Sequence, residues 1–317
     1  MGLRPLEVVC WRLEAKDKNR GKRIRDSRQG SSQSEALLQQ PEAIIHPNDL
    51  NHLNEKKMKL FDSHCHLDDN TYTRDLASVI ERAHSAGVAR LMTIGVNGKT
   101  SARAVELAES HPEIYASVGV HPHDAGHCRE SVIDDLLNLA KNPKVRAWGE
   151  IGLDFNRMYS PREDQEKWFR KQLETAGSLD LPMIFHERDS NGRFLEMLKK
   201  HADHKLKGVV HCFSGDQNEL ERYLDLGLYI GITGILTIKG RGARLRKLAA
   251  FIPPERLVVE TDAPYLVPAP EKNHHRRNEP AFVKSVMLKL AAVRQEEPDQ
   301  LAETIWDNTC KLYGIEA

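Results

Sequence analysis

The sequence lacks an excess of charge of either sign. Its 317 residues include 46 lysines and arginines and 46 aspartates and glutamates. A chain with no net charge has no bulk electrostatic attraction to nucleic acid. Any polyanionic partner therefore has to be bound by local groups.

The chain also lacks long hydrophobic runs and closely spaced cysteines. No apolar run approaches the roughly 18 residues that a membrane span needs, and the first residues have no compact apolar core typical of a signal peptide. No C-x-x-C pair occurs, and a scattered set of cysteines suits a reducing compartment. We therefore expect a cytoplasmic protein without a membrane segment. The five cysteines are Cys10, Cys65, Cys128, Cys212 and Cys310.

Residues 1–57 lack sustained apolar periodicity. Eight lysines and arginines but only three acidic residues lie between residues 12 and 28, and a polar stretch follows. This composition predicts a disordered N-terminal extension that is solvated. Two alternatives stay open: a basic arm that contacts nucleic acid, and translation from a start codon upstream of the natural start at Met58. Acidic residues disfavour a mitochondrial presequence; they are Glu7, Glu14, Asp17 and Asp26.

From residue 58 to residue 317, short β-rich runs alternate with amphipathic helical patterns. The expected strands are 59–62, 90–95, 115–120, 145–150, 182–186, 207–211, 228–232 and 257–262. The expected helices are 74–86, 100–110, 131–141, 161–179, 191–201, 217–226, 240–250, 279–295 and 299–312. Eight strands, each followed by a helix, predict an α/β fold that closes into a parallel (β/α)8 barrel. An open doubly wound sheet is the alternative, but its first strand should lead into a glycine-rich phosphate loop, and His-Cys-His occupies that place.

Polar side chains gather at the ends of the expected strands. His64 and His66 follow the first strand, and their i, i+2 spacing puts both imidazoles on one face. Because the carboxyl ends of barrel strands share one rim, the whole set should meet where barrel enzymes carry their chemistry. Its members are His64, His66, His121, His123, Glu150, His186, His211 and Asp262.

Each of these residues has a structural interpretation when it is considered alone. A single histidine at the end of an apolar strand, such as His186 or His211, is often a hydrogen-bonded core residue. A carboxylate in that position, such as Glu150 or Asp262, needs a partner or a cation. Glu260 could face the same site or belong to a structural ion pair. Together, four histidines and two carboxylates favour a metal site.

Six such ligands exceed what one tetrahedral ion requires and predict a binuclear centre. We assign His64, His66 and Asp262 to one ion and His186 and His211 to the other, with Glu150 as the bridge. Two divalent ions can generate hydroxide from water near neutral pH, and Asp262 could orient or deprotonate that water. The expected reaction is hydrolysis without an organic cofactor.

The identity of the two metal ions stays open. Imidazole ligands favour zinc or manganese, whereas phosphodiester hydrolysis often uses magnesium. Cys65 and Cys212 neighbour the expected ligands, but strand alternation should turn both away, so we interpret them as packing residues.

Six motifs in order resemble the TatD family of metal-dependent hydrolases, within the amidohydrolase-like TIM barrels. The resemblance covers residues 58–317 and implies a deoxyribonuclease that trims nucleic acid from a 3′ end, in DNA repair or DNA degradation. It also implies that His64, His66, Glu150, His186, His211 and Asp262 are the metal ligands. The motifs are DSHCHLD at 62–68, GVHPH at 119–123, GEIGLDF at 149–155, HERD at 186–189, HCFSG at 211–215 and ETDAPYL at 260–266.

Substrate contacts are expected from the loops at the same rim. Arginine can bind phosphate through two parallel hydrogen bonds, although Arg157 and Arg188 could instead pair with Asp154 or Asp189. The run from Lys239 to Arg246 could follow a nucleic-acid backbone or form a solvated helix face, and Tyr265 could stack a base or pack. The candidate substrate-binding residues are His121, His123, Asn156, Arg157 and Arg188.

Three functions follow from these predictions, and the first is favoured. It is a monomeric, metal-dependent 3′–5′ exonuclease acting on single-stranded DNA, with Glu150 and Asp262 as its catalytic residues. A hydrolase of another ester or amide, such as a D-aminoacyl-tRNA deacylase, could use the same centre because a fold constrains substrate weakly. A non-catalytic binding protein is the third, and the intact ligand set argues against it.

Overall fold

The computed structural model describes residues 58–201 and 206–317. The predicted extension at residues 1–57 lies outside the described residues, so its disorder and the domain boundary near Met58 stay predictions.

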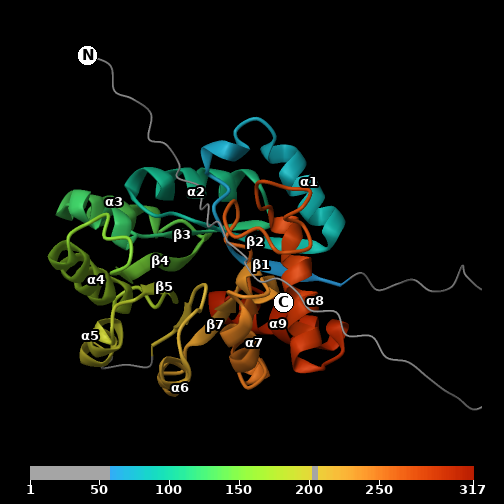
Figure 1. Cartoon of the computed structure of the whole chain (residues 1–317). Helices are drawn as coiled ribbons and strands as arrows, with labels where there is room; N and C mark the ends of the chain where they lie inside the picture. The colour runs from blue at the N-terminus through green and yellow to red at the C-terminus, as the bar shows by residue number, and fades with distance from the viewer. Residues whose placement is uncertain (1–57, 202–205) are drawn as a thin grey trace, which may run out of the picture. The chain divides into compact units, whose positions relative to one another are not determined.

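Eight parallel strands form one sheet in which each strand pairs with the next along the chain. The order confirms the predicted (β/α)8 topology. Figure 1 shows the strands at the centre with helices around them. The strands are β1 Leu60–Cys65, β2 Val88–Ile94, β3 Ile114–Val118, β4 Val145–Asp154, β5 Met183–Arg188, β6 Gly208–Val210, β7 Tyr229–Ile232 and β8 Leu257–Val259.

The segment after β8 brings the last strand back to the first. Cys65 and Ala263 form an isolated parallel bridge. The amide of Asp262 donates to the carbonyl of His64 at 2.9 Å, and the amide of His66 donates to the carbonyl of Ala263 at 2.7 Å. These bonds nearly close the barrel at the end of β1, where His64 and His66 lie.

Nine helices accompany the strands in the described residues. Two begin with reciprocal capping boxes, Asn97 with Thr100 and Asp216 with Glu219, which satisfy amide groups that have no partner within the helix. The helices are α1 Leu76–Ala86, α2 Gly98–Ser110, α3 Glu130–Leu139, α4 Arg162–Gly177, α5 Arg193–His201, α6 Gln217–Asp225, α7 Ala243–Ala249, α8 Val283–Arg294 and α9 Pro298–Tyr313.

The C-terminal helix α9 packs against the strands through aromatic side chains. The ring of Phe61 lies 6.0 Å from that of Trp306 and 6.0 Å from that of Tyr313, measured between centroids. The Tyr313 hydroxyl also donates to the carbonyl of Ser63 at 3.0 Å. Helix α9 therefore holds β1 in place one residue before His64.

Several strand ends differ from their predicted positions, and those of β4 and β8 change the description of the site. Strand β4 continues to Asp154 instead of ending at residue 150, so Glu150 and Asp154 lie on one strand. Strand β8 ends at Val259 instead of residue 262, because the buried Asp62 side chain accepts from the Thr261 amide at 2.9 Å and from its hydroxyl at 2.6 Å. These side-chain bonds replace strand pairing just before Asp262.

Within residues 58–201 and 206–317, no helix combines the length and the apolar character needed to cross a membrane.

Candidate metal centre

The first group of possible ligands joins the two ends of the barrel sheet. His64 is in β1, His66 follows β1, and Asp262 lies three residues beyond β8. Their ligand atoms all lie within 4.8 Å of one another. The Asp262 Oδ1 atom is 3.4 Å from His66 Nε2 and 3.8 Å from His64 Nε2. Three such donors could hold one divalent cation.

The second group comes from three adjacent strands. Glu150 in β4, His186 in β5 and His211 just after β6 also have ligand atoms within 4.8 Å of one another. Oε1 of Glu150 lies 2.7 Å from His186 Nδ1 and 3.9 Å from His211 Nε2. Oε2 of the same carboxylate lies 3.4 Å from His64 Nε2. One carboxylate therefore faces both groups, one oxygen toward each.

The burial of these groups fits a cation better than a set of internal hydrogen bonds. His64 is fully buried, yet neither of its ring nitrogens has a hydrogen-bond partner in the described residues. A buried polar group without a partner is costly. Nitrogen and carboxylate donors in this number are what zinc, manganese and related ions prefer, so the residues present fit a metal ion.

The carboxylates of the centre are held in their charged form. Burial alone would raise the pKa of Glu150, but His121, His211 and His64 outweigh it and hold that pKa well below its usual range. Burial also opposes ionisation of Asp262, and the hydrogen bond from His66 together with nearby imidazoles lowers its pKa. Both carboxylates are thus available to a cation near neutral pH.

The histidines fall into two classes. Burial lowers the pKa of His64 and brings that of His121 to about 3, so both rings are neutral. For His186 and His211 burial acts in the same direction, but carboxylates outweigh it. Asp154 and Glu150 raise the pKa of His186 to about 9, and Glu260 and Glu150 raise that of His211 to about 10. In the metal-free protein the carboxylates thus keep a proton on these two rings.

Comparison with known proteins decides the family. The TatD related DNase family model matches residues 61–314. The chain belongs to the TatD family. It is 42% identical over 261 residues to the 3′-5′ ssDNA/RNA exonuclease TatD of Rahnella sp., covering 81% of this chain and 99% of the relative. It is 38% identical to the Escherichia coli K12 protein of that name over 258 residues, covering 81% and 99%.

Solved structures of TatD relatives share the fold. YJJV, a TatD homolog from Escherichia coli K12, superposes with a TM-score of 0.75 at 31% identity, over 82% of this chain and 99% of that one. A TatD family hydrolase from Entamoeba histolytica gives 0.74 at 26% identity, over 81% and 98%. Together with the family match, these relatives confirm the predicted class, a hydrolase that acts on phosphodiester bonds in nucleic acid.

In this TatD chain the two histidines after β3 lie beside the predicted ligands. His121, His123 and His186 form a third group of possible ligands. The Nε2 atom of His121 is 3.4 Å from Oε1 of Glu150, and Nε2 of His123 is 2.7 Å from Oδ2 of Asp154. Both histidines therefore belong to the site, and their predicted contact with substrate phosphate stays a prediction.

Asp154 is a site residue, although the sequence alone indicates it only as a partner for arginine. Its carboxylate meets His123 and lies 3.4 Å from His186 Nε2, and hydrogen bonds with these rings lower its pKa despite burial. Strand alternation puts residues 150 and 154 on one face. That spacing was the signal, and it was missed because the strand was expected to end at residue 150.

The remaining predicted substrate residues lie at the edge of the site. Asn156 Nδ2 donates to Asp189 Oδ2 at 2.7 Å, and the amides of Asn156 and Arg157 donate to Asp154 Oδ1 at 2.9 and 2.8 Å. Arg188 ends β5, two residues after His186, and lines a neighbouring cavity. Their contacts with substrate stay predictions.

Glu260 supports the ring of His211, and Cys212 lies beside it. Oε1 of Glu260 lies 2.9 Å from His211 Nδ1 and accepts from the Cys212 amide at 2.6 Å, which favours the ion-pair interpretation of Glu260. The expectation that Cys212 turns away is wrong, because its sulfur lies within 4.8 Å of ligand atoms of His211 and Asp262. Strand alternation does not apply there, since β6 ends at Val210 and Cys212 has a positive φ of 49°.

Proposed function

We propose that this protein is a 3′–5′ exonuclease that hydrolyses single-stranded nucleic acid at two divalent cations. In this proposal it is a cytoplasmic monomer and needs no organic cofactor. The names of its relatives, which are 3′-5′ ssDNA/RNA exonucleases, support the polarity and the substrate. The observation that carries the proposal is the Glu150 carboxylate, whose two oxygens face two separate groups of histidines.

The proposed ligand assignment follows the two groups around Glu150. His64, His66 and Asp262 would hold one ion, His186 and His211 the other, and Glu150 would bridge them. When bound, two such ions would stabilise the charge that develops on the attacking and leaving oxygens and would lower the pKa of water. Four imidazoles among six donors favour Mn²⁺ or Zn²⁺ for tight binding, with Mg²⁺ as the weaker alternative.

Side chains of this chain would position and move the proton of the attacking water. Asp262 is about 15% exposed at its side chain and has a lowered pKa, so its carboxylate can accept a proton at neutral pH. Glu260 holds His211 through Nδ1, which leaves Nε2 directed at Glu150 and Asp262. Such outer carboxylates fix the tautomer and the orientation of a ligating imidazole.

Two exposed tyrosines beside the centre support a single-stranded substrate. Tyr159 is 65% exposed, and its ring lies 4.7 Å from that of His123. Tyr265 is 52% exposed, and its ring lies 5.7 Å from that of His66. Unpaired bases stack on such rings regardless of sequence, at roughly 1–3 kcal/mol per base. In a duplex, neighbouring base pairs cover the faces of each base, so a base inside a duplex could not stack on these rings.

A cleavage assay with end-labelled oligonucleotides tests the proposal. Protein stripped of metal is given Mg²⁺, Mn²⁺ or Zn²⁺ and 5′-labelled single-stranded DNA or RNA. We expect a ladder of products shortened one nucleotide at a time from the 3′ end, and slower shortening of a blunt duplex. Products that are shortened from the 5′ end, or an intact oligonucleotide with all three metals, would contradict it.

The control variant is Glu150→Gln, which keeps the size of the side chain but removes its charge. We expect at least a 100-fold loss of cleavage, because one neutral oxygen replaces a bridging carboxylate. Aminoacyl-tRNA in the same panel tests the ester-hydrolase alternative. Deacylation of D-aminoacyl-tRNA with no shortening of DNA or RNA would replace the nuclease by that function.

A further inference from the structure

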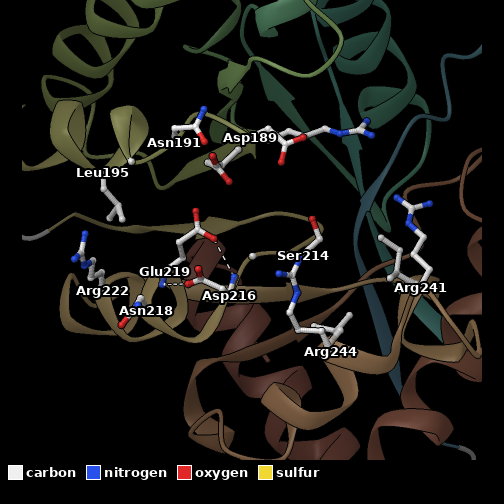
Figure 2. Close-up of a pocket in the computed structure, with 16 residues that line it drawn as sticks. Asp189, Asn191, Leu195, Ser214, Asp216, Asn218, Glu219, Arg222, Arg241 and Arg244 are labelled. Carbon is white, nitrogen blue, oxygen red and sulfur yellow. Dashed lines mark hydrogen bonds between the residues drawn. The ribbon is translucent and has the colours of Figure 1, made fainter.

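A cavity of about 620 Å³ adjoins the candidate metal centre. It lies beyond the ends of β5, β6 and β7, and its lining begins with Glu187 and Arg188, directly after His186. Ser214, three residues after His211, is part of the opposite lining. The volume falls within the range of roughly 300–1,000 Å³ that is typical of ligand pockets. Figure 2 shows the lining side chains, which come from loops and from helices α5, α6 and α7.

Four arginines line this cavity. Arg244 donates to the carbonyl of Ser214 at 3.0 Å. In residues 58–201 and 206–317, no carboxylate oxygen lies within 4.0 Å of the guanidinium nitrogens of Arg188, Arg222, Arg241 or Arg244. Unpaired guanidinium groups facing one cavity are available to an anionic ligand.

The carboxylates of the same lining already have hydrogen-bond partners. Oε1 of Glu187 accepts from the amide and hydroxyl of Ser190 at 3.0 and 2.7 Å. In the capping box of α6, the backbone amides of Asp216 and Glu219 each donate to the carboxylate of the other residue at 2.9 Å, and Figure 2 marks both bonds with dashed lines. The lining holds as many carboxylates as arginines, so anion binding would depend on individual guanidinium groups and not on net charge.

We infer that the cavity binds backbone phosphates of the strand on the 5′ side of the cleaved bond, with Arg241 and Arg222 as contacts. The inference rests on the proposed function. A 3′ exonuclease releases one nucleotide beyond the cleaved bond, so the rest of the strand has to leave the centre across the rim. The cavity continues from the ends of β5 and β6, where His186 and His211 lie, and Arg222, Arg241 and Arg244 in its lining are exposed to solvent.

The test compares substrates of two lengths in Arg241→Gln, Arg222→Gln and a matched control. Arg170→Gln removes an exposed arginine from α4, outside the cavity lining. A dinucleotide has one phosphodiester, which the metal centre occupies, whereas a 12-mer reaches the cavity. We expect each cavity variant to raise KM for the 12-mer about 10-fold, the size of a lost charge-assisted hydrogen bond. The same variants should raise KM for the dinucleotide by a smaller factor. Arg170→Gln should have the KM of the unsubstituted protein for both substrates.

Salt dependence and direct binding make the result independent of turnover. Each cavity variant should reduce the slope of log affinity against log salt by about 0.7, the loss of one contact with a single strand. Fluorescence anisotropy of a labelled 12-mer without added metal measures this even if nothing is cleaved. Equal binding by Arg241→Gln, Arg222→Gln and Arg170→Gln, or equal losses on the two lengths, would overturn the inference. If the unsubstituted protein binds the 12-mer more tightly than the cavity variants but cleaves nothing, the proposed function fails, and only the binding of strand phosphates by the cavity arginines holds.

Discussion

The Nδ1 atom of His186 lies 2.7 Å from Oε1 of Glu150, although the two residues are 36 positions apart in the sequence. They meet because β4 and β5 pair in parallel, with Gly152 opposite His186. The close approach of these strands therefore sets the geometry between the proposed bridging carboxylate and one of the proposed metal ligands.

Replacing Gly152 should damage both stability and the centre. Gly152 has a φ of 147°, and a Cβ at this position would collide with the carbonyl oxygen of His186. We expect Gly152→Ala to lower the free energy of unfolding by about 1–3 kcal/mol, the usual cost of overpacking, and to reduce metal affinity. Urea denaturation measures the first effect. Gly177→Ala is the control, because a Cβ there meets nothing within 4 Å; an equal loss in both variants would contradict the explanation.

Asp262→Asn should separate proton transfer from cation binding. The amide keeps one oxygen that can ligate but cannot accept a proton, so kcat should fall about 10²–10⁴-fold, the usual contribution of a general base. Metal content measured on the same sample shows whether the ions are retained. Asp135→Asn, an exposed residue of α3, should behave like the unsubstituted protein. A kcat within two-fold of normal in Asp262→Asn would remove Asp262 from the proton-transfer step.

Metal binding should release protons from the two histidines with raised pKa values. The pKa of His186 is about 9 and that of His211 about 10 in the metal-free protein, so both rings are protonated at pH 7. A ligating imidazole has to be neutral, and metal affinity should therefore rise as pH increases from 7 toward 9. Titration calorimetry at pH 7 in phosphate and in Tris should give apparent enthalpies that differ by the ionisation of about two protons. The same enthalpy in both buffers would contradict the assignment of these ligands.

Removing residues 1–57 should leave the nuclease intact. Every predicted ligand lies between His64 and Asp262, and the family match begins at residue 61. We expect a protein starting at Met58 to keep kcat/KM for single-stranded DNA within about two-fold and to keep its melting temperature. A large loss of affinity for DNA with an unchanged kcat would instead support the basic-arm interpretation of the extension.

Much of the barrel could be predicted because short apolar runs alternate with amphipathic helices. Each strand and helix of the described residues overlaps a predicted one, since burial on both faces leaves a clear pattern in parallel strands. Strand ends were less predictable. Nothing in the run from Val258 to Asp262 indicates that Asp62, 199 positions away from Thr261, replaces strand pairing with side-chain bonds.

The candidate site likewise has features that the sequence pattern predicts and features that depend on contacts between distant residues. The six predicted ligands come together because each lies near the end of a strand, which is a local property of the sequence. The pairing of Glu260 with His211 and the position of Cys212 depend on a positive φ and on contacts between separate loops. Neither contact could be read from periodicity, so Glu260 stayed ambiguous and Cys212 was assigned to packing.

Counting bound ions during activation tests the central claim most directly. Protein stripped with a chelator is titrated with Mn²⁺ while free ion and exonuclease rate are followed together. We predict two ions per chain and a rate that appears only as the second ion binds, and Glu150→Gln should lose this second step. Full activity with one ion per chain, or with none, would contradict the binuclear centre.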